Sequence, residues 1–143
     1  MLTPDTLAAA ENLVRTLADK GLTIATVESC TGGLLSAAIT AVPGSSAVFE
    51  RGYITYSNEA KTALVHVPRE LIMHQGAVSE DVAQAMAEGA FRQARVDIAL
   101  SITGIAGPGG GTDAKPVGLV HFGAVNRTGL LLLEHEVFPG DRT

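Results

Sequence analysis

The spacing of apolar residues at the start of the chain predicts a helix followed by a strand. Thr3 and Pro4 have the character of an N-cap and a first helical residue. The apolar positions that follow recur at helical spacing: Leu7, Ala10, Val14 and Leu17. Gly21 can end this helix, and residues 23–27 (TIATV) are short, β-branched and apolar, as expected of a buried strand.

The same two patterns alternate along the rest of the chain. We expect one helix at residues 34–42, another at 57–65 with Ser57 as its N-cap, and a third that Ser79 caps. The expected strands are residues 46–56, 97–104, 117–125 and 130–138, the last two forming a hairpin. This alternation predicts a single three-layer α/β/α domain over residues 1–143, with a mixed, mostly parallel sheet and a C-terminal antiparallel hairpin.

The composition fits one soluble globular domain. Of the 143 residues, 46% are hydrophobic and 17% are charged, and there is no Trp, so Ala, Val, Leu and Ile must build the core. The formal net charge is −5 and Lys and Arg form no cluster. Nucleic-acid binding is therefore not expected, because it needs a basic surface.

The cysteine count and the apolar runs point to the cytoplasm. Cys30 is the only cysteine, so an intrachain disulfide is impossible and a reducing compartment is the natural environment. The first residues lack the basic start and apolar core of a signal peptide. No apolar run approaches the roughly 20 residues that span a membrane, so no membrane association is expected.

The stretch ESCTGG, residues 28–33, lies between a strand-like and a helix-like run. Ligands of α/β sheets bind where strands end, and the first amides of a helix can bind an anion or an oxyanion. Ser29 is therefore a candidate nucleophile. The alternative is that Ser29 or Thr31 only caps the next helix. Cys30 is a weaker candidate, because no local sequence signature supplies the basic partner that makes a thiolate.

A second polar stretch is YSNEAK, residues 56–61. With Ser57 as N-cap, Tyr56 and Lys61 occupy the two positions that pack together at a helix start, so the tyrosine hydroxyl and the lysine amine can converge. A desolvated lysine can serve as a base near neutral pH. The alternative is an ordinary exposed lysine.

The glycine-rich residues 104–113 follow a strand that ends at Thr103. Such a loop can cradle a phosphate through its amides, or it can simply be mobile. The four histidines have no metal-ligand spacing, so no metal site is expected.

Five blocks of the chain, in order, resemble the CinA C-terminal domain family, also known as nicotinamide-nucleotide amidases of the PncC type. The blocks are TVESCTGGLLS, FERGYITYSNEAK, GAVSEDVAQAM, SITGIAGPGGGTDAKPVG and VFPGDR. The resemblance implies deamidation of nicotinamide mononucleotide to nicotinate mononucleotide and ammonia, a step in pyridine nucleotide salvage that needs no cofactor.

The resemblance also assigns roles to residues. It implies Ser29 as nucleophile, Lys61 as base and Tyr56 as its assistant. It places Thr103 and Arg142 at the substrate site. Thr31, Gly32, Gly33 and Gly104 are further candidates for binding the substrate, and the amides of the glycine turn can stabilise the oxyanion. Two alternatives stay open: a catalytically silent module that binds a nucleotide or a partner, and an amidase that depends on Cys30.

The family's domains usually continue past PGDR into a final helix, so the resemblance implies that this helix is missing after Thr143. An uncovered face would favour self-association, and we expect a homo-oligomer.

Overall fold

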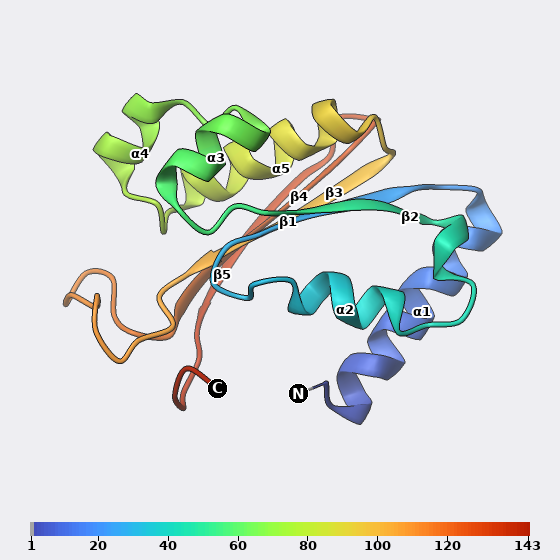
Figure 1. Ribbon diagram of the computed structural model, residues 1–143, viewed down its shortest axis with the longest axis horizontal. Helices are drawn as coiled ribbons and strands as arrows, with labels where there is room; N and C mark the ends of the chain where they lie inside the picture. The colour runs from blue at the N-terminus through green and yellow to red at the C-terminus, as the bar shows by residue number, and fades with distance from the viewer. Residues whose placement is uncertain (1) are drawn as a thin grey trace.

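The computed structural model describes residues 2–143 and has a five-stranded sheet at its centre (Figure 1). The strands are β1 (Ile24–Glu28), β2 (Phe49–Ile54), β3 (Ile98–Gly104), β4 (Leu119–Asn126) and β5 (Leu131–Val137), and they lie in the order β2–β1–β3–β4–β5. β1 pairs in parallel with β2 and β3, whereas β4 is antiparallel to both β3 and β5. The predicted single domain, with a mixed sheet and a C-terminal antiparallel hairpin, is confirmed.

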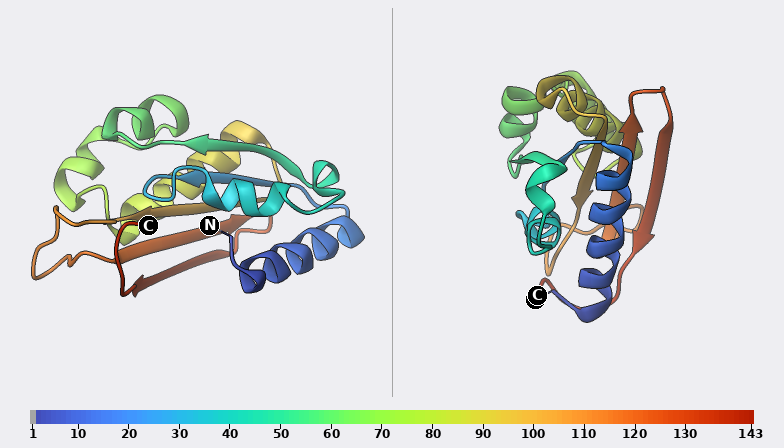
Figure 2. Two further views of the ribbon diagram at one scale, coloured as in Figure 1. Left: turned by 60° about the horizontal axis from the view of Figure 1, so that its bottom comes forward. Right: turned by 90° about the vertical axis from the view of Figure 1, so that its right-hand side faces the viewer.

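Helices cover both faces of this sheet. On one face lie α1 (Pro4–Lys20) and α2 (Leu34–Thr40), and on the other lie α3 (Asn58–Val65), α4 (Arg69–Gln75) and α5 (Glu80–Ala94). The two views in Figure 2 show the same layering from other directions. One buried apolar cluster joins the sheet to α5, and a second joins it to α1 and α2. The predicted three layers are thus present.

The helix starts follow the predicted caps. The side chains of Thr3, Ser57 and Ser79 each accept a hydrogen bond from a backbone N–H three residues on, at 3.2, 3.0 and 3.2 Å. These bonds satisfy amides that the helix itself leaves unpaired.

Some boundaries differ from the expectation. The helix expected at 34–42 ends at Thr40, and the strand expected at 46–56 is shortened by the 3₁₀ turn η1 (Ser45–Ala47). Residues 68–76, for which no element was predicted, contain α4.

The side chains of β1 alternate between the two faces, and this alternation positions the site. Ala25 and Val27 belong to the cluster on the α5 side, whereas Ile24 belongs to the cluster on the α1 side. By the same alternation, the next side chain, Glu28, points toward α2, and the one after it, Ser29, points toward α3. The Ser29 N–H still bonds to the Ile102 carbonyl oxygen of β3 at 3.0 Å, so the ladder holds Ser29 in register.

The sheet is more open at its β5 edge. β5 is an edge strand, and its Leu132 is exposed. Beside it, α2 and strands β3 to β5 enclose an apolar trough of about 290 Å³, lined by Leu35, Leu100, Phe122 and Leu132 among others. Within residues 2–143, no helix has the length and apolar character that crossing a membrane requires.

Candidate functional site

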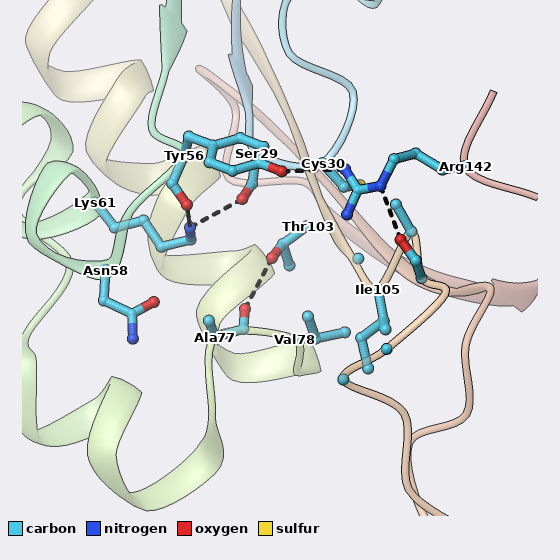
Figure 3. Close-up of a pocket in the computed structure, with 15 residues that line it drawn as sticks. Ser29, Cys30, Tyr56, Asn58, Lys61, Ala77, Val78, Thr103, Ile105 and Arg142 are labelled. Atoms are coloured by element: carbon cyan, nitrogen blue, oxygen red, sulfur yellow. Dashed lines mark hydrogen bonds between the residues drawn. The ribbon is translucent and has the colours of Figure 1, made fainter.

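A pocket of about 260 Å³ lies where β1 and β3 end (Figure 3). Its walls come from the turn after β1, the start of α3, the loop before α5, the tip of β3 with the glycine-rich loop that follows, and Arg142. This is the edge of the sheet where the sequence placed a ligand site. Segments far apart in the chain meet here because parallel strands carry their following loops to the same edge.

Ser29 and Lys61 face each other in this pocket. The Lys61 Nζ lies 3.0 Å from the Ser29 Oγ, and it also donates to the carbonyl oxygens of Thr55, at 2.8 Å, and Tyr56, at 3.3 Å. Figure 3 shows the amine pointing from α3 toward the serine. The pair is therefore within direct proton-transfer distance.

Lys61 is buried because of how α3 packs. Its side chain is only 1% exposed, and Val65, one turn further along α3, is also fully buried. α3 can approach α5 closely because α5 carries Gly89 at the contact, where an added Cβ would lie 1.8 Å from the Val65 carbonyl oxygen. The alternative of an exposed surface lysine is wrong.

Burial also changes the acidity of the Lys61 ammonium. Desolvation lowers the pKa of Lys61 below its ordinary value of 10.5, and a charged Cys30 thiolate would oppose that shift. Among residues 2–143, the partners of the amine are two carbonyl oxygens and one hydroxyl, and none is a carboxylate. The environment thus favours the neutral amine more than water does.

Glu28 organises the turn that carries Ser29. Its fully buried carboxylate accepts hydrogen bonds from the Thr31 hydroxyl, the Leu35 N–H and the N–H and hydroxyl of Ser36, at 2.7 to 3.0 Å. Burial alone would raise the pKa of this carboxyl, but the four hydrogen bonds outweigh it and the pKa lies below its usual value. The carboxylate therefore stays charged and caps α2 from the preceding strand.

The capping alternative for Ser29 and Thr31 is wrong. Gly33 occupies the N-cap position of α2 without a side-chain hydrogen bond, and the Thr31 hydroxyl donates to Glu28 instead. Because Glu28 already serves the first amides of α2, the Ser29 hydroxyl is left to face Lys61.

Cys30 lines the same pocket but differs from Ser29 in its ionisation. Burial raises the pKa of the Cys30 thiol, although the backbone amides of Cys30 and Thr31 and the Lys61 charge act the other way. The thiol is therefore protonated at neutral pH, and its structural setting does not favour a cysteine nucleophile.

Tyr56 reaches Lys61 through its backbone and not through its ring. Its carbonyl accepts from Lys61, while its hydroxyl, on a side chain that is largely exposed, accepts from the Arg142 Nη1 at 3.3 Å. The expected convergence of the Tyr56 hydroxyl with the Lys61 amine is wrong. Arg142 also donates from Nε to the Gly107 carbonyl at 2.8 Å, so it links the tyrosine to the glycine-rich loop.

The predicted substrate-binding residues divide into two groups. Thr103, Gly104 and Arg142 line the pocket, and the Thr103 hydroxyl donates to the Ala77 carbonyl at 2.9 Å. By contrast, Thr31, Gly32 and Gly33 lie outside the lining. The Gly32 N–H is bonded to the Ser29 carbonyl at 3.1 Å, so it is not free for an oxyanion.

Sequence reasoning missed two features of the site. Asn58 lines the pocket although only its neighbours in YSNEAK were singled out. The role of Glu28 was also missed, and the signal was present: a charged residue at the end of a fully buried strand needs compensating hydrogen bonds. Within residues 2–143, no group of three His, Cys, Asp or Glu side chains is arranged to hold a metal ion.

The fold and the site define an α/β domain in which a buried lysine amine faces a serine hydroxyl at the ligand-binding edge of the sheet. Comparison with known proteins gives the family. The CinA C-terminal domain matches residues 6–143, and the chain belongs to this family.

Two relatives and one solved structure illustrate the similarity. The chain is 46% identical over 142 residues to nicotinamide-nucleotide amidohydrolase PncC of Escherichia coli K12, covering 99% of this chain and 86% of that protein. It is 54% identical over 132 residues to a CinA-like protein of Citrifermentans bemidjiense, covering 92% of this chain but spanning only 32% of that longer protein. The crystal structure of competence/damage inducible protein CihA from Agrobacterium tumefaciens matches with a TM-score of 0.95 and 42% identity, covering 97% of this chain and 84% of that one.

Proposed function

We propose that this chain hydrolyses the carboxamide of nicotinamide mononucleotide, giving nicotinate mononucleotide and ammonia, with Ser29 as nucleophile and Lys61 as base. The observation that carries the proposal is the 3.0 Å contact between the Lys61 Nζ and the Ser29 Oγ. The printed function of the Escherichia coli relative supports the choice of substrate.

The surroundings of Lys61 support its role as a base. A neutral amine has two N–H groups and one lone pair. The carbonyl oxygens of Thr55 and Tyr56 can only accept, so they take the two N–H groups. The lone pair then faces the Ser29 hydroxyl, which donates its proton along the same line.

The reaction proceeds in two halves. As the Ser29 Oγ forms a bond to the amide carbon, Lys61 takes the hydroxyl proton and the carbonyl oxygen becomes an oxyanion. The C–N bond then breaks, and Lys61 returns the proton to the departing nitrogen, which leaves as ammonia. Water attacks the resulting ester with Lys61 again as base, which releases the carboxylic acid and restores Ser29. No metal or organic cofactor takes part.

The backbone N–H of Cys30 is the proposed oxyanion donor. In the part of the chain that the structure describes, this N–H has no backbone acceptor outside the helices and strands. Cys30 lines the pocket and directly follows Ser29, and the amide after the nucleophile is one of the oxyanion donors of α/β-hydrolases. It replaces the amides of the glycine turn, which the sequence suggested for this role.

The other end of the pocket suits the phosphate. Arg142 donates from Nε to the Gly107 carbonyl and from Nη1 to the Tyr56 hydroxyl. Its Nη2 and the amides of the glycine-rich loop are the proposed donors to the phosphate oxygens. Thr103 and Gly104 line the same pocket. The substrate thus extends from the serine toward Arg142.

Ammonia release from nicotinamide mononucleotide tests the proposal. The parent chain is compared with Ser29→Ala and Lys61→Met, and with the matched exposed controls Ser46→Ala and Lys20→Met. We expect turnover by the parent and both controls, and none by the two site variants, with circular dichroism showing that all are folded. A folded parent that releases no ammonia would favour a silent binding module.

A further inference from the structure

Asn58 occupies a position in the pocket that no other role accounts for. It is the first residue of α3, directly after the Ser57 cap, and it lies three residues before Lys61. Residues three apart share one face of a helix, and both side chains line the pocket. Figure 3 shows the Asn58 amide below Lys61 in the view, on the side toward Ala77.

The hydrogen bonds of the pocket leave Asn58 without a partner. Every other lining side chain that carries nitrogen or oxygen is already bonded within the described chain: Ser29 to Lys61, Thr103 to the Ala77 carbonyl, and Tyr56 to Arg142. The Asn58 side chain is exposed, and its amide makes no hydrogen bond within residues 2–143. The amide is therefore open to a ligand in the pocket that it lines.

We propose that Asn58 recognises the scissile carboxamide and determines that this site prefers a primary amide, an inference that rests on the proposed function. An asparagine presents an acceptor oxygen and two N–H donors, which complement a primary amide. Its Oδ1 accepts an N–H of the substrate amide and holds the nitrogen on the Lys61 side of Ser29. That is where the nitrogen must lie, because Lys61 returns the proton when the C–N bond breaks.

The same contact distinguishes an amide from an ester at the reacting carbon. The leaving oxygen of an ester carries no N–H, so it cannot donate to the Asn58 Oδ1. A site that binds an N–H discriminates against a group that lacks it.

Two substrates that differ only in the leaving group test this inference. Nicotinamide mononucleotide has N–H groups on its leaving nitrogen, and the methyl ester of nicotinate mononucleotide has none. We expect Asn58→Ala to lower kcat/KM for the amide about tenfold, the effect of losing one hydrogen bond, and to change the ester by less than about twofold. Glu59→Ala, which alters the next residue of the same helix outside the pocket, should leave both values unchanged.

Other outcomes separate the two proposals. Equal losses for amide and ester in Asn58→Ala would overturn the inference, because Asn58 would then bind a part that the substrates share, such as the ribose. A parent chain that hydrolyses neither substrate would refute the proposed function itself.

Discussion

Replacing Glu28 by glutamine is expected to destabilise the fold by about 1–4 kcal/mol at neutral pH. The side chain keeps its size, so the change removes one acceptor and one charge from a fully buried site. Both oxygens of the carboxylate are in use: one accepts from Thr31 and Leu35, and the other accepts from both donors of Ser36.

The magnitude follows from which donors can adapt. Wherever the glutamine NH₂ is placed, the facing hydroxyl, of Thr31 or Ser36, can rotate and accept. The facing backbone N–H, of Leu35 or Ser36, can only donate and is therefore left without an acceptor. A buried unpaired donor costs about 1–3 kcal/mol. Loss of the negative charge at the start of α2 adds about 0.3–1 kcal/mol.

Urea unfolding at several pH values measures this effect. The pKa of Glu28 in the folded chain lies below its ordinary value of 4.5, so its stabilisation is complete above that pH and is lost as the pH falls through the folded-state pKa. The difference in unfolding free energy between the parent and Glu28→Gln should therefore become smaller only at acidic pH. The exposed Glu59→Gln should stay within about 0.5 kcal/mol of the parent. A Glu28→Gln chain that matches the parent at pH 7 would refute the reasoning.

Three further predictions concern the site and its support. Amidase kcat/KM should fall as the pH drops through the lowered pKa of Lys61, because only the neutral amine accepts a proton; a flat pH–rate profile would contradict this. Cys30→Ala should keep its turnover in the ammonia assay, and a loss comparable to that of a nucleophile variant would support the cysteine mechanism instead. Gly89→Ala should lower the unfolding free energy in urea titrations by about 1–3 kcal/mol, because its Cβ would lie 1.8 Å from the Val65 carbonyl oxygen. The control Gly109→Ala, whose Cβ would have no neighbour within 4 Å, should change the unfolding free energy little.

Local patterns predicted the frame of the site well. Ser57 is the N-cap that the sequence indicated, and this fixes Lys61 on the inward face of α3 together with Val65. The apolar run before Ser29 forms the interior strand β1, between β2 and β3, which explains why the serine lies at the ligand-binding edge. Both are short-range features, in which neighbouring residues determine the geometry.

Long-range contacts determined what could not be predicted. The Tyr56 hydroxyl turns to Arg142, a residue 86 positions later, and no local pattern reveals that partner. The close packing of α3 on α5 at Val65 likewise depends on Gly89 in another helix. Glu28 caps α2 across a turn of five residues, so the usual search for a capping residue directly before a helix does not find it.

The central claim, that Ser29 attacks the amide carbon, is tested most directly by trapping the acyl-enzyme. The chain is mixed with nicotinamide mononucleotide, quenched in acid within the first turnover, digested and analysed by mass spectrometry. The account predicts a nicotinate mononucleotide ester on Ser29, absent from Lys61→Met. The acyl group on Cys30, or turnover with no adduct on residues 28–33, would contradict it.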